Sequence, residues 1–275
     1  MAETLSDSAG DLPTIRKGLI AVVTGAGSGV GEAIARKLAI QGVKVALVGR
    51  TAAKLDRVLQ SIRKARGQAD VFPCDVADPD QVEGLKAAVV ERFGDPQVLV
   101  NNAGLHCELV PISETTPRKW IETFGVNAIG PYLTCRAFMN EMISQGWGRI
   151  INVTSAASLG QPGYVGAVYQ LSKVALNHFT RQLAAELEGT GVTANVIHPG
   201  EVKTEMWAAI KADAMSRTGL GRDALKWADM VEKTGGDPPE KAAELVLELL
   251  TPKGDTINGQ FLWIKDGIQK PKPTW

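Results

Sequence analysis

The fold class that the sequence predicts is α/β, with one doubly wound parallel sheet in a single domain, and three observations predict it. Short apolar runs alternate regularly with segments whose apolar residues recur at helical spacing. A parallel sheet covered by helices on both faces produces this alternation. No internal repeat, low-complexity tract or Gly/Ser linker separates a second domain. The length of 275 residues is compatible with one such domain.

The alternation begins near the amino terminus. A strand is expected over Leu19–Thr24 and a helix over Val30–Gln41. Another strand over Val43–Val48 precedes a second helix, in which the apolar spacing runs from Leu55 to Ile62. Five more strands are expected, separated by helical patterns: Ala69–Cys74, Gln97–Val100, Arg149–Val153, Thr193–Ile197 and Phe261–Ile264.

Segments outside this pattern set the boundaries of the domain, which we place at 18–267. Residues 1–17 hold no continuous apolar core, so they are neither a secretory signal nor a transit peptide and are expected to form a flexible tail. Residues 268–275 are expected to form a second tail. The glycine-interrupted segment 201–237 follows a strand and is expected to be a substrate loop, acting as a lid or a binding loop.

The composition restricts the class of partner. Hydrophobic residues make up 44% of the chain, and 30 basic side chains balance 30 acidic ones. There is thus no net field to attract nucleic acid or an anionic membrane, and no run reaches the ~20 apolar residues of a membrane helix. Cys74, Cys107 and Cys135 lie far apart and form no CxxC pair, which indicates a reducing compartment and no zinc site. We expect a cytoplasmic protein without a metal, nucleic-acid or membrane partner.

The turn after the first strand, residues 24–31, reads TGAGSGVG and leads directly into a helix. Glycines permit a tight turn and the close approach of a pyrophosphate, while the amino end of the helix supplies amides and partial positive charge. In this context the pattern predicts a Rossmann-type dinucleotide site, and a glycine-rich turn packed for steric reasons is the alternative. The expected contacts are Gly25, Ser28, Val30 and Gly31.

The end of the second strand, Val48-Gly49-Arg50-Thr51, bears on the choice of cofactor. An acid at this place binds the 2′-hydroxyl of NAD, whereas an arginine pairs with the 2′-phosphate of NADP. Because the acid is absent and Arg50 offers a forked cation, we favour NADP(H). The alternative is a solvated Arg50 with use of NAD.

Two segments predict catalytic chemistry. Tyr169 and Lys173 place a phenol and an ammonium four residues apart on one helix face. The cation, joined by an oxidised nicotinamide, is expected to lower the phenol pKa from about 10. Tyr164 is the rival phenol, but no lysine stands four residues beyond it. Thr154 and Ser155 end the fifth strand, where a hydroxyl can bind a carbonyl and stabilise an alkoxide. Because side chains alternate along a strand, only one of the two faces the cleft.

The TGxxxGxG spacing and the YxxxK pair resemble the short-chain dehydrogenase/reductase family in its single-domain form, and the likeness extends over about 18–267. The resemblance implies that Ser155 is the catalytic hydroxyl and that Asn127 supports a water-linked proton relay to Lys173. It also implies a set of contacts to the cofactor beyond the glycine loop: Asp75, Val76, Asn102, Tyr169, Lys173, Val202 and Thr204.

The activity that the resemblance implies is reversible interconversion of a ketone and a secondary alcohol. Ser155 would hold the oxygen, Tyr169 would exchange the proton, and Lys173 would bind the nicotinamide ribose. His198 is expected to pack at a strand end rather than to act in catalysis. The alternatives are a nucleotide-sugar epimerase or dehydratase, which is generally longer, and a non-catalytic dinucleotide sensor, which tends to lose the tyrosine or the lysine.

The expected substrate walls are Leu105–Ile112, Ala156–Tyr164 and Met206–Trp227. They are apolar and aromatic, which favours an uncharged, moderately bulky carbonyl compound or alcohol. The family resemblance further implies a homo-oligomer, a tetramer or a dimer, paired through two long helices that we expect at Pro117–Gln145 and Ala167–Glu188.

Overall fold

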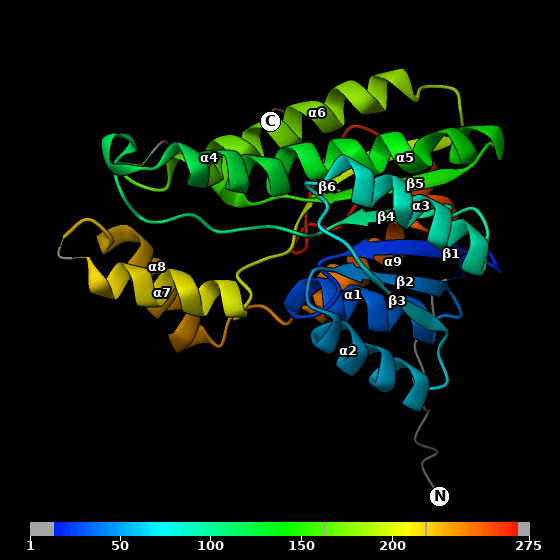
Figure 1. Ribbon diagram of the computed structural model, residues 1–275, viewed down its shortest axis with the longest axis horizontal. Helices are drawn as coiled ribbons and strands as arrows, with labels where there is room; N and C mark the ends of the chain where they lie inside the picture. The colour runs from blue at the N-terminus through cyan, green and yellow to red at the C-terminus, as the bar shows by residue number, and fades with distance from the viewer. Residues whose placement is uncertain (1–13, 162, 218, 269–275) are drawn as a thin grey trace, which may run out of the picture.

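The computed structural model describes residues 14–161, 163–217 and 219–268. Within this part of the chain, a seven-stranded parallel sheet has the strand order β3-β2-β1-β4-β5-β6-β7 (Figure 1). This confirms the predicted fold class, and each strand lies within one or two residues of its expected place. The strands are β1 Ile20–Thr24, β2 Lys44–Gly49, β3 Ala69–Pro73, β4 Val98–Asn101, β5 Gly148–Val153, β6 Val192–His198 and β7 Phe261–Trp263.

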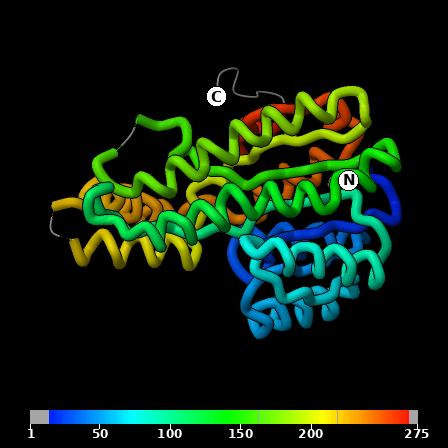
Figure 2. The backbone as a smooth tube through the Cα atoms, turned by 45° about the horizontal axis from the view of Figure 1, so that its top comes forward, coloured from blue at the N-terminus to red at the C-terminus, as the bar shows by residue number. Residues whose placement is uncertain are grey.

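Helices cover both faces of the sheet, and two hydrophobic clusters fill the layers between them (Figures 1 and 2). Successive residues of β1 face opposite layers, so Val23 joins one cluster and Val22 the other. One face carries α1 Gly29–Ile40, α2 Ala52–Lys64 and α9 Glu240–Leu249, and the other carries α3 Pro79–Phe93, α5 Gly130–Ser144 and α6 Ala167–Glu186.

The strand order reverses at β1, which pairs with β2 on one side and with β4 on the other. In a doubly wound sheet this reversal leaves a crevice at the carboxyl ends of the strands, where ligands bind. The glycine loop follows β1 and the Asn102–Gly104 segment follows β4. The topology therefore brings the predicted cofactor residues to one place.

The long helical pattern predicted over Pro117–Gln145 is interrupted in the structure. Helix α4, Pro117–Phe124, continues through a π-helical turn, Gly125–Ile129, into α5. Such turns alter the hydrogen-bond ladder of a helix and are frequent at functional sites. Asn127, a predicted catalytic residue, lies within this turn.

The expectation of a loop at 201–237 is wrong, because most of this segment is helical. Helices α7, Glu205–Ser216, and α8, Arg222–Thr234, form a hairpin that projects from the body of the domain (Figure 1). Its two helices share a small apolar core, in which the Trp207 indole packs with Val231 and donates to the Ala228 carbonyl oxygen at 3.1 Å. The glycines that suggested a loop stand between and after the helices rather than inside them.

The described ends of the chain extend the domain slightly beyond its predicted limits. Ile15 packs against the core, the Arg16 guanidinium lies 4.7 Å from the centre of the Trp147 ring, and Ile268 is buried. The rest of the two predicted tails, 1–13 and 269–275, lies outside the described residues. In the described ranges, no helix combines the length and the apolar character needed to cross a bilayer.

Candidate active site

The glycine loop forms a cradle that has no space for side chains. A Cβ on Gly25, whose φ is +64°, would lie 2.7 Å from Asn102 Nδ2, and a Cβ on Gly31 would overlap the same amide and the Gly25 carbonyl. Ser28 precedes α1 and makes no side-chain hydrogen bond to that helix end. The first amides of α1 are thus available to an anion, and the cradle fits a dinucleotide pyrophosphate.

Asn102 and Thr24 brace this loop against the next strand. The Asn102 side chain donates to the carbonyl oxygens of Thr24 and Gly25 at 3.0 and 3.2 Å. The Thr24 hydroxyl accepts from the amides of Asn102 and Ala103, both at 3.0 Å. Asn102 therefore shapes the cofactor crevice through the backbone that it holds.

The adenosine end of the crevice is a cavity of about 200 Å³ between the ends of β1, β2 and β3. Arg50 lines it with 53% of its side chain exposed, and its Nη1 lies 3.9 Å from the Asp75 carboxylate. Val76 is buried and lines the same cavity. The structure thus brings Arg50, Asp75 and Val76 together in the lining of one cavity, and their contacts with an adenine ribose stay a prediction.

The same cavity contains a lysine that the sequence reasoning missed. Lys54 follows Arg50 by four residues, on the first turn of α2, and lines the cavity beside it. Lys54 stands on the turn of α2 that directly follows the end of β2, and this closeness in the sequence was the available signal.

At the other end of the crevice, Ser155 and Tyr169 come together with Lys173. The Ser155 hydroxyl lies beside the Tyr169 phenol, whose pKa it lowers, and it accepts from the Ala157 amide at 3.2 Å. The Lys173 Nζ donates to the Val153 carbonyl oxygen at 2.9 Å and lies 6.0 Å from the centre of the Tyr169 ring. The three side chains come from the end of β5 and one face of α6.

Thr154, the other hydroxyl considered at this strand end, has a structural partner. It is buried, and its Oγ1 is 2.6 Å from the Asn177 Oδ1, to which it donates. His198 is also buried, as predicted; its Nδ1 accepts from the Ala156 amide and its ring packs on the edge of Trp263. These contacts leave Ser155 as the strand-end hydroxyl that faces Tyr169.

Burial shifts both titrating groups toward their neutral forms. It raises the pKa of the Tyr169 phenol, and the Ser155 hydroxyl opposes this rise only in part. It lowers the pKa of Lys173 to about 8. In the protein alone the pKa of the phenol is therefore raised, because the cost of burying its charged form is the larger effect. The expected lowering by Lys173 together with an oxidised nicotinamide stays a prediction.

Asn127 uses its whole side chain to hold other segments. Its Oδ1 accepts from the Leu105 amide at 2.7 Å, and its Nδ2 donates to the Leu105 carbonyl and, at 3.0 Å, to the Ser172 hydroxyl. Ser172 in turn donates to the Tyr169 carbonyl oxygen at 2.7 Å. Asn127 thus joins the loop after β4 to the turn of α6 that carries Tyr169.

The segment after β6 closes over the glycine loop. A Cβ on Gly29 would lie 3.0 Å from the Thr204 Cγ2, so Thr204 stands directly beside the start of α1. Its hydroxyl accepts from the Trp207 amide at 3.3 Å and caps α7. Val202, two residues earlier, is buried.

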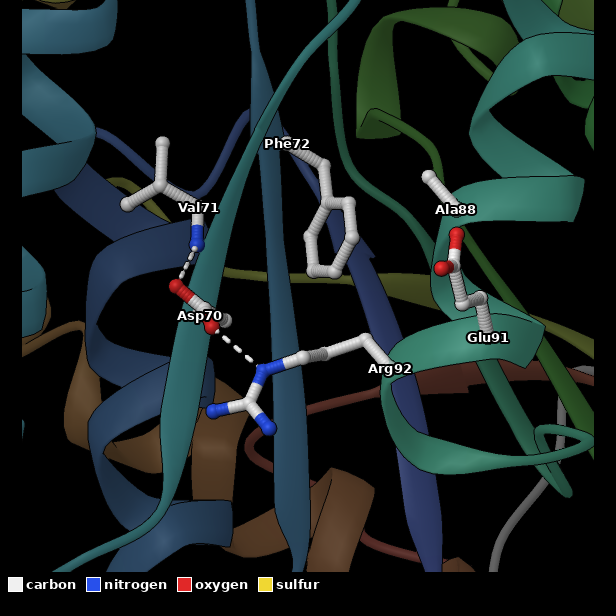
Figure 3. Close-up of a pocket in the computed structure, with 6 residues that line it drawn as sticks. All are labelled: Asp70, Val71, Phe72, Ala88, Glu91 and Arg92. Atoms are coloured by element: carbon white, nitrogen blue, oxygen red, sulfur yellow. Dashed lines mark hydrogen bonds and ion pairs between the residues drawn. The ribbon is translucent and has the colours of Figure 1, made fainter.

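A further hollow of about 420 Å³ lies between β3 and α3, away from these residues (Figure 3). The Asp70 carboxylate in it is paired with Arg92 at 2.7 Å, and this pairing lowers the Asp70 pKa. The hollow is open, and its lining contains no glycine and none of the serine, tyrosine and lysine residues that the sequence singled out. The larger cavity is therefore not the candidate active site.

Comparison with known proteins decides the family. The family model described as short chain dehydrogenase matches residues 19–215, which include the glycine loop, Ser155, Tyr169 and Lys173. The chain belongs to the short-chain dehydrogenase family. It is accordingly an oxidoreductase of the class that acts on the CH–OH group of donors, and the resemblance seen in the sequence is confirmed.

Relatives of this family cover nearly the whole domain. A putative ketoacyl reductase of Streptomyces coelicolor is 37% identical over 254 residues, which are 90% of this chain and 96% of the relative. D-threitol dehydrogenase of Mycolicibacterium smegmatis is 36% identical, over 91% and 92% of the two chains. The crystal structure of a variant of actinorhodin polyketide ketoreductase with NADPH has a TM-score of 0.82 and 32% identity, over 89% and 95% of the two chains.

Proposed function

We propose that this short-chain dehydrogenase interconverts a ketone and a secondary alcohol with NADP(H) as its cofactor. The observation that carries the proposal is the meeting of Ser155, Tyr169 and Lys173 at one end of a crevice whose other end is a dinucleotide cradle. The similar ketoreductase structure with NADPH supports this choice of cofactor. The test is a panel of carbonyl compounds and alcohols assayed with both cofactors.

The residues of the site have distinct roles in this proposal. The cofactor held by the glycine loop would supply or accept the hydride and, in its oxidised form, would contribute a positive charge to the site. Ser155 binds the carbonyl oxygen and stabilises the charge that develops on it, while Tyr169 donates the proton in reduction and accepts it in oxidation. Lys173 favours the phenolate when it is protonated and holds the nicotinamide ribose.

Asn127 acts in this scheme as a positioning residue. Its side chain is occupied by Leu105 and Ser172, so a relay water would bind its backbone carbonyl rather than its amide. The π-helical turn alters the hydrogen bonding of the backbone at this point. Replacement of Asn127 would then act mainly by releasing the turn of α6 that carries Tyr169.

Acidic side chains near the site restrict the substrate. Burial is the main cause of the raised Tyr169 pKa, and the Glu201 carboxylate adds a smaller contribution in the same direction. Asp213, from α7, accepts from the Leu109 amide at 2.7 Å. Both carboxylates would repel an anionic substrate. We therefore propose an uncharged carbonyl compound or alcohol of moderate size, as the apolar walls also favour.

Two alternative functions, a dinucleotide sensor and an NAD-dependent alcohol dehydrogenase, would require fewer of the observed site residues. A dinucleotide sensor would bind the cofactor but would have no use for the contact between Ser155 and Tyr169. An NAD-dependent alcohol dehydrogenase would have no use for Arg50 in the adenosine cavity. The observed positions of these residues favour the NADP(H)-dependent enzyme over both.

Cofactor choice is testable at Arg50. Removal of this cation by Arg50→Ala should weaken NADPH binding roughly ten- to a hundredfold, since a charge-assisted contact contributes about 1.5–3 kcal/mol, while NADH binding changes little. Gly49→Asp should shift the preference toward NADH by repelling the phosphate. Direct titration of the wild type provides the control, and equal or better affinity for NADH would contradict an arginine that recognises phosphate.

We also propose a homo-oligomer, a tetramer or a dimer, in a reducing, cytoplasmic environment. Large apolar side chains are exposed on the helices that are expected to pair, among them Ile121 on α4, Tyr132 on α5 and Val174 on α6. The three cysteines are free and buried, which is compatible with a reducing, cytoplasmic environment. Light scattering at micromolar concentration should give the mass of at least a dimer, and a monomer mass would contradict this proposal.

A further inference from the structure

The adenosine cavity is connected to the α7–α8 hairpin by one ion pair. Lys54, which lines the cavity beside Arg50, places its Nζ 2.6 Å from the Oε2 of Glu205. Lys54 belongs to the first turn of α2, and Glu205 is the first residue of α7. The pair therefore joins two helices that lie on either side of the glycine loop.

Both partners are positioned by contacts with that loop. A Cβ on Gly27 would lie 2.9 Å from the Lys54 Cβ, so the stem of Lys54 packs against the glycine loop. Thr204, which precedes Glu205, approaches Gly29 in the same way. The Lys54 ammonium is thus held at the rim of the cavity, with only its outer end free to change partner.

The charges in the cavity leave a role for a second cation. A phosphate monoester carries about −1.5 to −2 charges near pH 7, and Arg50 already faces the Asp75 carboxylate. Arg57, nearby on α2, donates to Glu32 at 2.8 Å and to the Gly27 carbonyl at 3.0 Å. Lys54 pairs with Glu205, whose side chain is 66% exposed, and such exposed pairs contribute little.

We propose that Lys54 is the second cation that binds the 2′-phosphate of NADP(H), and that Glu205 is the counter-ion which Lys54 leaves when that phosphate arrives. This inference rests on the proposed function, because it requires a nicotinamide dinucleotide in the crevice. A phosphate offers Lys54 a stronger, charge-assisted bond than an exposed carboxylate does. Lys54 then adds selectivity for NADP(H), and the phosphate releases the start of α7 from α2.

Titration of the protein with NADP⁺ and with NAD⁺ in a calorimeter tests this assignment, because the two dinucleotides differ only in the 2′-phosphate. Lys54→Met keeps the packed stem and should weaken NADP⁺ binding about tenfold while NAD⁺ binding changes less than about twofold. Glu205→Gln should strengthen NADP⁺ binding by roughly two- to threefold, because it removes the competitor. The control is Lys86→Met. Lys86 lies on α3, on the other face of the sheet from α2, and forms an ion pair with Glu141. Its replacement should change the affinity for neither dinucleotide.

The double variant separates competition from an unrelated effect. In the Lys54→Met background, Glu205→Gln should no longer change NADP⁺ affinity. If Lys54→Met weakens the binding of both dinucleotides equally, Lys54 binds the pyrophosphate. If it changes neither affinity, Lys54 only forms a surface ion pair. Either result would overturn this inference and leave the proposed function standing. Failure of the wild type to bind either dinucleotide would overturn the proposed function together with the inference.

Discussion

Replacement of Tyr169 by phenylalanine should lower turnover by at least ~10²-fold, because it removes the proton donor and keeps the ring. The fold and the affinity for NADPH should remain close to those of the wild type, since the aromatic ring is kept and only the hydroxyl beside Ser155 is lost. Steady-state kinetics with the best ketone of the panel, together with cofactor titration, measures both properties.

Tyr164→Phe is the matched control for this prediction. Tyr164 lies in the segment before α6 with 75% of its surface exposed, and it is the rival phenol in the sequence. The control should retain turnover. Near-normal activity of Tyr169→Phe with a loss in Tyr164→Phe would transfer the catalytic role to Tyr164.

Lys173→Met should likewise lower turnover by at least ~10²-fold, and it should also stabilise the fold. Burial lowers the Lys173 pKa from 10.5 to about 8, which corresponds to a cost of roughly 3 kcal/mol when the amine is charged. The variant escapes this cost but loses the hydrogen bond to the Val153 carbonyl oxygen, which is worth about 1 kcal/mol. A net gain of about 2 kcal/mol in the free energy of unfolding is therefore expected at pH 7.

The pH dependence of this gain follows from the direction of the shift. Because the folded protein binds the Lys173 proton more weakly than the unfolded chain does, the cost is present in full below pH 8 and fades between pH 8 and 10.5. Denaturant unfolding of both proteins at pH 7 and pH 10 measures it. Lys226→Met, at an exposed lysine, is the control and should show no such dependence. A destabilised Lys173→Met at pH 7 would contradict the burial cost.

Local patterns were sufficient for the parts of the molecule that a short segment determines. Apolar alternation predicted the strands, and the glycine spacing predicted the loop between β1 and α1. The end of β2 predicted the presence of Arg50 in the adenosine cavity. Each of these features depends on residues that are close together in the sequence.

Contacts between distant residues could not be predicted in this way. The ion pair of Lys54 and Glu205 joins positions 151 residues apart, and the Asn101 side chain donates to Asn152 across two buried strands. The α7–α8 hairpin was missed because its core forms between two helices, around Trp207, and its glycines resembled those of a loop. The raised pKa of Tyr169 depends on the whole surrounding fold, so the YxxxK spacing could not reveal it.

The most direct test of the proposed function is transfer of deuterium from 4-deuterated NADPH to a panel of uncharged ketones. The proposal predicts one deuterium on the new carbinol carbon of the product, formed by the wild type and at least ~10²-fold more slowly by Tyr169→Phe. Tight binding of NADPH without transfer to any ketone of the panel would contradict it, because that behaviour belongs to a dinucleotide sensor.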